Sequence, residues 1–201
     1  MKLYYCPMTR ATRPRWLLEE IGAPYELVRV DLSKGEQRRP DYLKIHPHGR
    51  VPALVDGDTT VVESAAICLY LADRFPEHAL APALTSPARG PYYQWMVYSV
   101  ATLEPPVLKV FMNTVRRPEA ERRAHEVEEG RTDFAQMATV LTQALGSGPF
   151  LLGETFTAAD VMIGSVVGWA RGLKLLDQHP ALVEYSRRLT ARPAYRRATA
   201  D

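Results

Sequence analysis

Two short stretches of this 201-residue chain decide its fold. They read HPHGRVPAL over residues 46–54 and VESAAI over residues 62–67. The Val51-Pro52 peptide bond can adopt the cis form at a cost of only about 0.5–1 kcal/mol. A cis turn would leave the N–H and C=O of Val51 pointing outward, where an extended peptide can pair with them as another strand would. Glu63 and Ser64 fall at the start of a predicted helix, whose first N–H groups suit a carboxylate.

The residues before these stretches predict a strand–helix–strand unit. Tyr-, Val- and Leu-rich runs at residues 2–5 and 26–30 are typical of strands. The helix between them is expected to take Thr12 as its cap and Pro14 in its first turn, where a missing N–H costs little. Such a unit normally gives parallel strands with a right-handed crossover.

Residues 53–56 and 59–62 predict a hairpin, and a helix is expected over residues 64–74. With the connecting segment before the hairpin, the order of elements is βαβ-α-ββα. We therefore expect an α/β thioredoxin-like N-terminal domain over residues 1–76, followed by an all-α C-terminal helical domain.

A linker is predicted at residues 77–87 and the helical domain at 88–201, where no convincing strand occurs. Apolar residues recur at helical spacing over residues 119–145 and predict a long helix. Pro105-Pro106 is expected to break or kink an earlier helix, because proline removes a donor and clashes with the preceding turn.

Composition narrows the class of protein. A formal net charge of +2 gives no indication of nucleic-acid binding, which usually shows a surplus of Lys and Arg. The start of the chain lacks the apolar core of a signal peptide, and the longest apolar stretch is shorter than a bilayer span requires. We therefore expect a cytoplasmic protein with no membrane partner. Five arginines near the C-terminus are interpreted as a solvated helical face: Arg187, Arg188, Arg192, Arg196 and Arg197.

The first stretches resemble the glutathione site of cytosolic glutathione transferases. In that family an N-P-x-G-x-V-P-x-L loop precedes a hairpin and an E-S-x-A-I helix start, and His46 stands here in place of the commoner Asn. Residues 150–160, FLLGETFTAAD, are similar to the F-L-x-G-x-x-[ST]-x-A-D signature of the family's helical domain. There Thr157 and Asp160 form a capping-box-like pair, which is a structural role. The chain resembles a bacterial, serine- or cysteine-type member with threonine at the catalytic position.

This resemblance implies a binding residue for each part of glutathione. The cysteinyl unit would pair with Val51 at the turn formed by Pro52. The γ-glutamyl unit would place its carboxylate at Ser64 and its ammonium at Glu63. Arg50 would meet the glycyl carboxylate.

The family's catalytic group lies where the first strand runs into the first helix. The candidates here are Tyr4, Tyr5, Cys6, Thr9 and Arg10, of which Thr9, Arg10 and Tyr5 are carried forward. Thr9 falls where serine-type members carry Ser, and its hydroxyl could donate to the glutathione sulfur. A hydrogen bond to a charged group contributes about 1.5–3 kcal/mol, enough to lower a thiol pKa by about one to two units. Arg10 could add positive charge near the sulfur, or it could be a solvated arginine.

Tyr5 matches the tyrosine-type branch only if one residue is gapped, and the alternative is an inward-facing strand aromatic. Cys6, in the run CPMT, resembles the C-P-x-[CS] motif of glutaredoxin-like proteins but precedes the helix by too much for that chemistry. We interpret it as a buried, inert thiol at a strand end, and Cys68 as a core residue.

The resemblance implies an enzyme that joins glutathione, as co-substrate, to a small hydrophobic electrophile, with no metal. Alternatives on the same fold are a glutathione-dependent isomerase, dehalogenase or disulfide reductase, or a non-catalytic protein-binding module. The family's habit also implies a homodimer, formed by the helix at residues 64–74 and the partner's helices around residues 92–100.

Overall fold

The computed structural model describes residues 1–201 and forms two compact units. The first consists of Met1–Ala81 together with Ala191–Asp201, and the second of Pro82–Thr190. The first unit contains a four-stranded mixed sheet with helices, and the second is helical. The predicted fold class, a thioredoxin-like domain followed by a helical domain, is confirmed.

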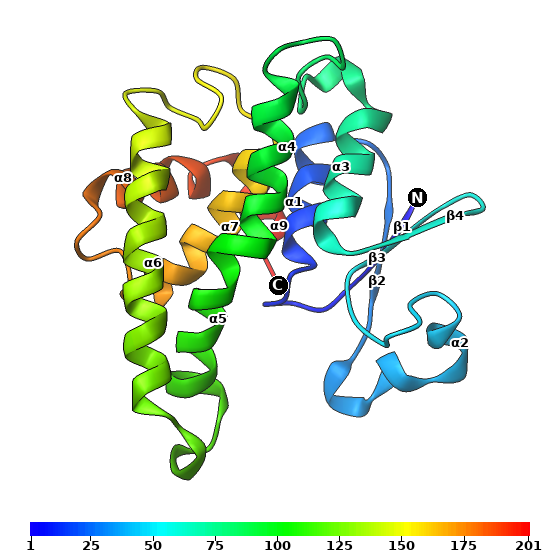
Figure 1. Ribbon diagram of the computed structural model, residues 1–201. Coiled ribbons are helices and arrows are strands. Elements are labelled where there is room, and N and C mark those ends of the chain that lie inside the picture. Colours follow the sequence, from blue (N-terminus) through cyan, green and yellow to red (C-terminus); the bar gives the residue numbers. More distant parts are fainter. The chain divides into compact units, whose positions relative to one another are not determined.

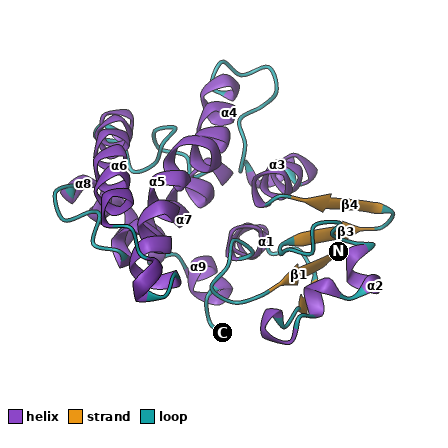
Figure 2. Ribbon diagram, turned by 60° about the horizontal axis from the view of Figure 1, so that its bottom comes forward, coloured by secondary structure: helices purple, strands orange, loops and turns teal.

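The sheet of the first unit has the strand order β2-β1-β3-β4. Its strands are β1 (Lys2–Tyr5), β2 (Glu26–Arg29), β3 (Ala53–Asp56) and β4 (Thr59–Val62). β1 runs parallel to β2 and antiparallel to β3, and β3 and β4 form the predicted hairpin. Figure 2 shows these strands side by side.

Helices lie on both sides of this sheet because residues along β1 alternate between its faces. Leu3 and Tyr5 are buried, on the face covered by α1 (Thr12–Ile21) and α3 (Ser64–Arg74), which pack against each other. Tyr4 faces the other side, where its ring contacts Tyr42 of the short helix α2 (Pro40–Leu43). Figure 1 shows α2 on the side of the sheet away from α1 and α3. Short 3-10 turns at Leu32–Lys34, Glu36–Arg38 and Pro76–His78 complete this part.

The hydroxyl that supports the start of α1 belongs to Thr9, so the prediction that Thr12 caps this helix is wrong. The residue before the helix is Ala11, and no side chain caps its first turn. The Thr9 hydroxyl instead accepts a hydrogen bond from the N–H of Ala11, at 3.2 Å. Two backbone bonds, Thr12 N to Thr9 O and Arg13 N to Arg10 O, form the turn that leads into the helix.

The last residues of the chain return to the first unit, where α9 (Pro193–Ala198) lies beside α1 (Figures 1 and 2). Arg192 forms two hydrogen bonds to the Glu20 carboxylate, at 2.6 and 2.8 Å. Arg197 donates to Glu19 at 2.7 Å. The interpretation of the arginine cluster as a solvated face is therefore wrong for Arg192, whose side chain is 30% exposed, whereas Arg197 is exposed, as predicted, while it pairs with Glu19. The same pairs explain why residues 191–201 pack with the N-terminal unit, whereas the predicted boundaries assigned them to the helical domain.

The second unit contains five α-helices. They are α4 (Arg89–Tyr98), α5 (Glu104–Phe111), α6 (Ala124–Leu145), α7 (Ala158–Gly172) and α8 (Pro180–Thr190). The prolines act where they were expected to: a π-helical turn at Ser99–Leu103 separates α4 from α5, and Pro105-Pro106 occupy the first turn of α5. A second π-helical turn spans Met112–Arg116, and the long helix begins at Ala124 because Glu119–Glu121 form a separate 3-10 turn.

The core of the second unit is organised around the start of α7. Thr157 and Asp160 form the predicted capping box. The fully buried Asp160 carboxylate also accepts hydrogen bonds from the Leu151 N–H at 3.0 Å and from the Tyr185 hydroxyl at 2.8 Å. One carboxylate thus connects α7 to α8 and to the loop before α7. None of the helices is both long and apolar enough to cross a membrane.

Replacing Asp160 with alanine should lower the free energy of unfolding by more than about 3 kcal/mol, because each buried donor left without an acceptor costs about 1–3 kcal/mol. Urea denaturation followed by circular dichroism measures this loss. The matched control is Thr157→Ala, which removes only the cap and should cost about 0.5–2 kcal/mol. Equal losses in the two variants would contradict this account of Asp160.

Candidate functional site

The strand register brings three loops of the first unit to one end of the sheet. Ala53 is paired both with Tyr4 of β1 and with Val62 of β4. The residues just beyond these positions are Tyr5 and the loop after it, Val51-Pro52, and Glu63-Ser64. The register therefore brings all three groups of predicted site residues to the same end of the sheet, which we call the site edge.

The loop before β3 is tightly built. The His46 side chain is 3% exposed, and the His46 carbonyl accepts a hydrogen bond from the Gly49 N–H at 2.8 Å. Gly49 has φ 57°, and a Cβ there would lie 2.6 Å from the Gln37 carbonyl oxygen, so only glycine fits. The next carbonyl, that of Arg50, accepts a hydrogen bond from the Tyr42 hydroxyl at 2.6 Å.

The Val51-Pro52 peptide bond is cis, as the sequence analysis considered. Pro52 is buried and Val51 is half-buried. Neither the N–H nor the C=O of Val51 forms a hydrogen bond within the protein. These groups can therefore pair with an extended peptide lying along the edge.

The start of α3 presents unpaired backbone N–H groups, which suit an anion. The first N–H groups of any α-helix have no intrahelical partner. In α3 no side chain caps the first turn either, so these groups also lack a side-chain acceptor. Glu63, the residue before the helix, has φ 71°, a conformation that non-glycine residues rarely adopt and that concentrates at functional sites. Its side chain is exposed and forms no ion pair, so its carboxylate is accessible to a ligand ammonium.

Arg13, which the sequence analysis did not single out, lies directly behind the start of α3. Its side chain is 2% exposed, and its Nη1 donates to the Ser64 hydroxyl oxygen at 3.2 Å. A permanent positive charge thus lies directly behind the helix end and adds to the favourable potential for a carboxylate. One signal could have identified it: an arginine on the apolar side of α1, one turn before Trp16.

Thr9 lies in the loop at the same end of the sheet, but its hydroxyl already has two partners. It donates to the Cys6 carbonyl at 2.7 Å and accepts from the Ala11 N–H at 3.2 Å. The neighbouring residues project outward: Arg10 is exposed, and Met8 is 98% exposed at φ 54°. A hydroxyl carries one proton, so Thr9 can donate to a ligand only by releasing the Cys6 carbonyl.

Tyr5 is an inward-facing aromatic at the end of β1. Its hydroxyl donates to the Asp201 carboxylate, which also pairs with Arg15, and the Arg15 guanidinium lies 5.1 Å from the centre of the Tyr5 ring. Burial first, and then Asp201, raise the pKa of Tyr5 above its usual value. Its hydroxyl proton is thus already engaged away from the loop.

The remaining candidates differ in accessibility. Arg50 is exposed and its guanidinium forms no ion pair, so it is accessible to a ligand carboxylate. Cys68 is fully buried inside α3, as predicted, but Cys6 is partly exposed at the end of β1, so the prediction that Cys6 is buried is wrong. Burial raises the pKa of the Cys68 thiol to about 12, against the opposing effect of the Arg13 charge.

Comparisons with known proteins agree over both units. Residues 1–73 match the family described as "Glutathione S-transferase, N-terminal domain", and residues 124–188 match "Glutathione S-transferase, C-terminal domain". The chain is 30% identical to the glutathione S-transferase GstA of Escherichia coli O157:H7, covering 96% of this chain and 94% of the relative. It is also 30% identical to the disulfide-bond oxidoreductase YfcG of Escherichia coli (strain K12), covering 96% of this chain and 91% of the relative.

Similarity extends to solved structures. The structure of a sphingomonad glutathione S-transferase complexed with glutathione superposes with a TM-score of 0.85 at 28% identity, covering 100% of this chain and 98% of that one.

The two thiols should differ sharply in reactivity. At about pH 8 the folded protein should react rapidly with one equivalent of a disulfide reagent such as DTNB, because only Cys6 is accessible and a thiol reacts as its thiolate. Absorbance at the released thiolate's maximum counts the reactive groups. Cys6→Ser should abolish the fast phase and Cys68→Ser should leave it unchanged. A fast phase that disappears in Cys68→Ser instead would overturn this assignment.

Proposed function

Because this chain belongs to the glutathione S-transferase family, whose co-substrate is glutathione, we propose that it conjugates the glutathione thiolate to small hydrophobic electrophiles. The sulfur attacks the electrophilic carbon, a thioether forms, and the leaving group departs with its electron pair. The observation that carries the proposal is the meeting of the unpaired Val51 backbone edge and the uncapped start of α3 at one end of the sheet.

The proposed binding mode uses each end of this edge. The Val51 N–H and C=O pair with the cysteinyl unit, while the N–H groups of α3 and the Ser64 hydroxyl hold the γ-glutamyl carboxylate. Glu63 receives the γ-glutamyl ammonium, and Arg50 receives the glycyl carboxylate. Arg13 supports this set from behind, since it donates to Ser64. The expected homodimer concerns two copies of the chain and stays a prediction.

Thiol activation is assigned to Thr9 in this proposal. A thiolate is a stronger acceptor than a neutral carbonyl, so the bound glutathione thiolate can accept the hydrogen bond that the Thr9 hydroxyl otherwise donates to the Cys6 carbonyl. The acceptor bond from the Ala11 N–H stays in place and keeps the hydroxyl oriented. Arg10 is the second candidate, as a source of positive charge in this loop. Tyr5 is the weaker candidate because its hydroxyl donates to Asp201.

A second activity, reduction of disulfides by glutathione, is favoured by the 30% identical relative named a disulfide-bond oxidoreductase. In that reaction two glutathione molecules reduce one disulfide to two thiols and leave oxidised glutathione. Parallel assays of the purified protein with a panel of electrophiles and with a small disulfide distinguish the two. The proposed conjugation falls if only the disulfide is turned over.

Ser64→Ala should weaken glutathione binding about 10- to 100-fold, because it removes one hydrogen bond to a charged group, a loss of about 1.5–3 kcal/mol. Glu63→Gln keeps the shape of the side chain and removes the charge that would hold the ammonium, so it should weaken binding to a similar extent. Thermal unfolding with increasing glutathione measures both, since a bound ligand raises the melting temperature. Ser147→Ala, at an exposed serine in the second unit, is the control and should show the full shift. If saturating glutathione leaves the melting temperature of the unmodified protein unchanged, the binding assignment is wrong.

Thr9→Val keeps the shape of the side chain and deletes its donor. The pKa of the bound glutathione thiol, followed by thiolate absorbance, should then rise by about one to two units. The conjugation rate at neutral pH should fall about 10- to 100-fold and recover at higher pH. Thr9→Ser retains the hydroxyl and should stay active. A loop disturbed only structurally would not shift the thiol pKa, so this readout separates the two roles.

Tyr5→Phe is the matching test of the alternative donor. It removes the hydroxyl that donates to Asp201 and should leave the thiol pKa unchanged. A rise in Tyr5→Phe without one in Thr9→Val would transfer the catalytic role to Tyr5.

A further inference from the structure

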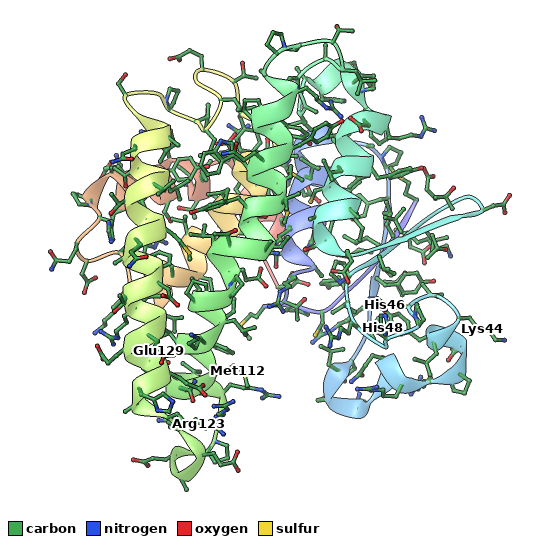
Figure 3. The ribbon with its side chains drawn as sticks, viewed as in Figure 1. Lys44, His46, His48, Met112, Arg123 and Glu129 are labelled. Carbon is green, nitrogen blue, oxygen red and sulfur yellow. The ribbon has the colours of Figure 1, made fainter.

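His46 occupies a position where the family's loop pattern commonly has asparagine, and the structure shows what its ring does there. The Nδ1 atom of His46 accepts a hydrogen bond from the backbone N–H of His48, at 3.3 Å. His46 is 3% exposed whereas His48 is exposed, so the buried ring holds a donor that lies at the surface of the loop. Figure 3 shows the two histidines together in the loop between α2 and β3.

This hydrogen bond sets the state of the imidazole. A nitrogen that accepts a hydrogen bond carries no proton, so His46 is neutral with its proton on Nε2. Adding a second proton converts Nδ1 into a donor, which then faces another donor, the His48 N–H. An asparagine side-chain oxygen could accept at this position at any pH of interest. Histidine therefore makes the bond conditional on pH, and asparagine would not.

The charged groups around the ring act in both directions. Glu63, at the start of α3, favours the protonated form, whereas His48 and Arg50 from the same loop disfavour it. Burial is the largest effect and lowers the pKa of His46 from its usual value, against the opposing effects of Glu63 and of a hydrogen bond to the residue's own backbone. The contribution of the neutral ring to this loop is therefore fully present above about pH 6.5, the ordinary value for histidine, and is lost as pH falls through the lower pKa of the closed loop.

The bond matters because it lies at the start of the segment that leads to Val51. The His46 carbonyl accepts from the Gly49 N–H, and the Arg50 carbonyl is held by the Tyr42 hydroxyl. The backbone of Val51, the next residue, is the proposed edge for glutathione. Loss of the hydrogen bond between the His48 N–H and the His46 ring would free the loop that ends at Val51. Ordering this loop again on binding costs free energy and so weakens the affinity for the ligand.

We propose that His46 is a positioning residue that makes glutathione binding pH-dependent: its neutral ring holds the loop before Val51 in the binding conformation, and protonation of the ring releases that loop. This inference rests on the proposed function, since it concerns the affinity of that same site. A loop with asparagine at this position would lack this pH-dependent contribution to glutathione affinity.

The test uses S-methylglutathione, which has no free thiol and so removes the thiol titration from the measurement. Isothermal titration calorimetry gives its Kd at about pH 7.5 and about pH 5.5, a range in which an ordinary α-carboxyl group stays ionised. Binding should be weaker at the lower pH. The ratio of Kd at about pH 5.5 to Kd at about pH 7.5 should be at least about threefold larger for the unmodified protein than for His46→Asn, following the linkage between protonation and binding. His48→Asn keeps the backbone donor but removes a charge that disfavours protonation of His46, so it should retain a pH dependence of the same direction.

Equal ratios in the unmodified protein and in His46→Asn would overturn the inference, as would loss of the dependence in His48→Asn alone. Glu63 is common to all three proteins, so its own titration cancels in the comparison. If His46→Asn does not fold, NMR of the unmodified protein decides: the His48 amide signal should shift with the titration of the His46 ring, and an amide that does not follow this titration overturns the inference. Absence of S-methylglutathione binding at the higher pH, in every variant, would instead reject the proposed function.

Discussion

The paired position of Ala53 is the constraint on which the rest of the site depends. One residue is in register with β1 on one side and with β4 on the other. Because of this, the loop after β1, the turn before β3 and the helix that follows β4 all begin at the same edge of the sheet. A slip of one residue in either pairing would turn the side chains of that strand to the opposite face and separate the three loops. The buried Leu3 and Leu54, which are opposite each other in β1 and β3, oppose such a slip, since they would lose their places in the core.

At this edge the protein offers an incoming molecule mostly backbone groups. The N–H and C=O of Val51 and the first N–H groups of α3 have no partner in the chain, and their directions are set by the cis turn and the helix axis rather than by flexible side chains. Groups positioned in this way lose little conformational entropy when they bind. The side chains that add to them are few, and one of them, Arg13, is buried behind the edge.

The start of α1 differs, because the hydroxyl proposed to activate the thiol also holds the loop together. Thr9 connects the Cys6 carbonyl to the Ala11 N–H, and the next turn of backbone bonds leads into the helix. A donor held by two partners is well oriented but must exchange one of them to act on a ligand. At the C-terminal end of α1, Glu19 binds Arg197 and Glu20 binds Arg192. The helix is therefore held at both of its ends. The loop therefore begins and ends on fixed elements.

The sequence by itself determined the order of elements, because strand alternation, turn residues and helix periodicity are local properties. The hairpin at residues 53–62, the helix at 64–74 and the capping box of Thr157 and Asp160 follow from such local patterns and occur as predicted. The tertiary structure alone decided which distant side chains meet. Arg13 beside Ser64, Tyr5 beside Asp201 and Arg192 beside Glu20 join residues that are 51 to 196 positions apart. No local pattern reports such pairs, since a charged residue on a helix looks the same in sequence whether water or another part of the chain neutralises it.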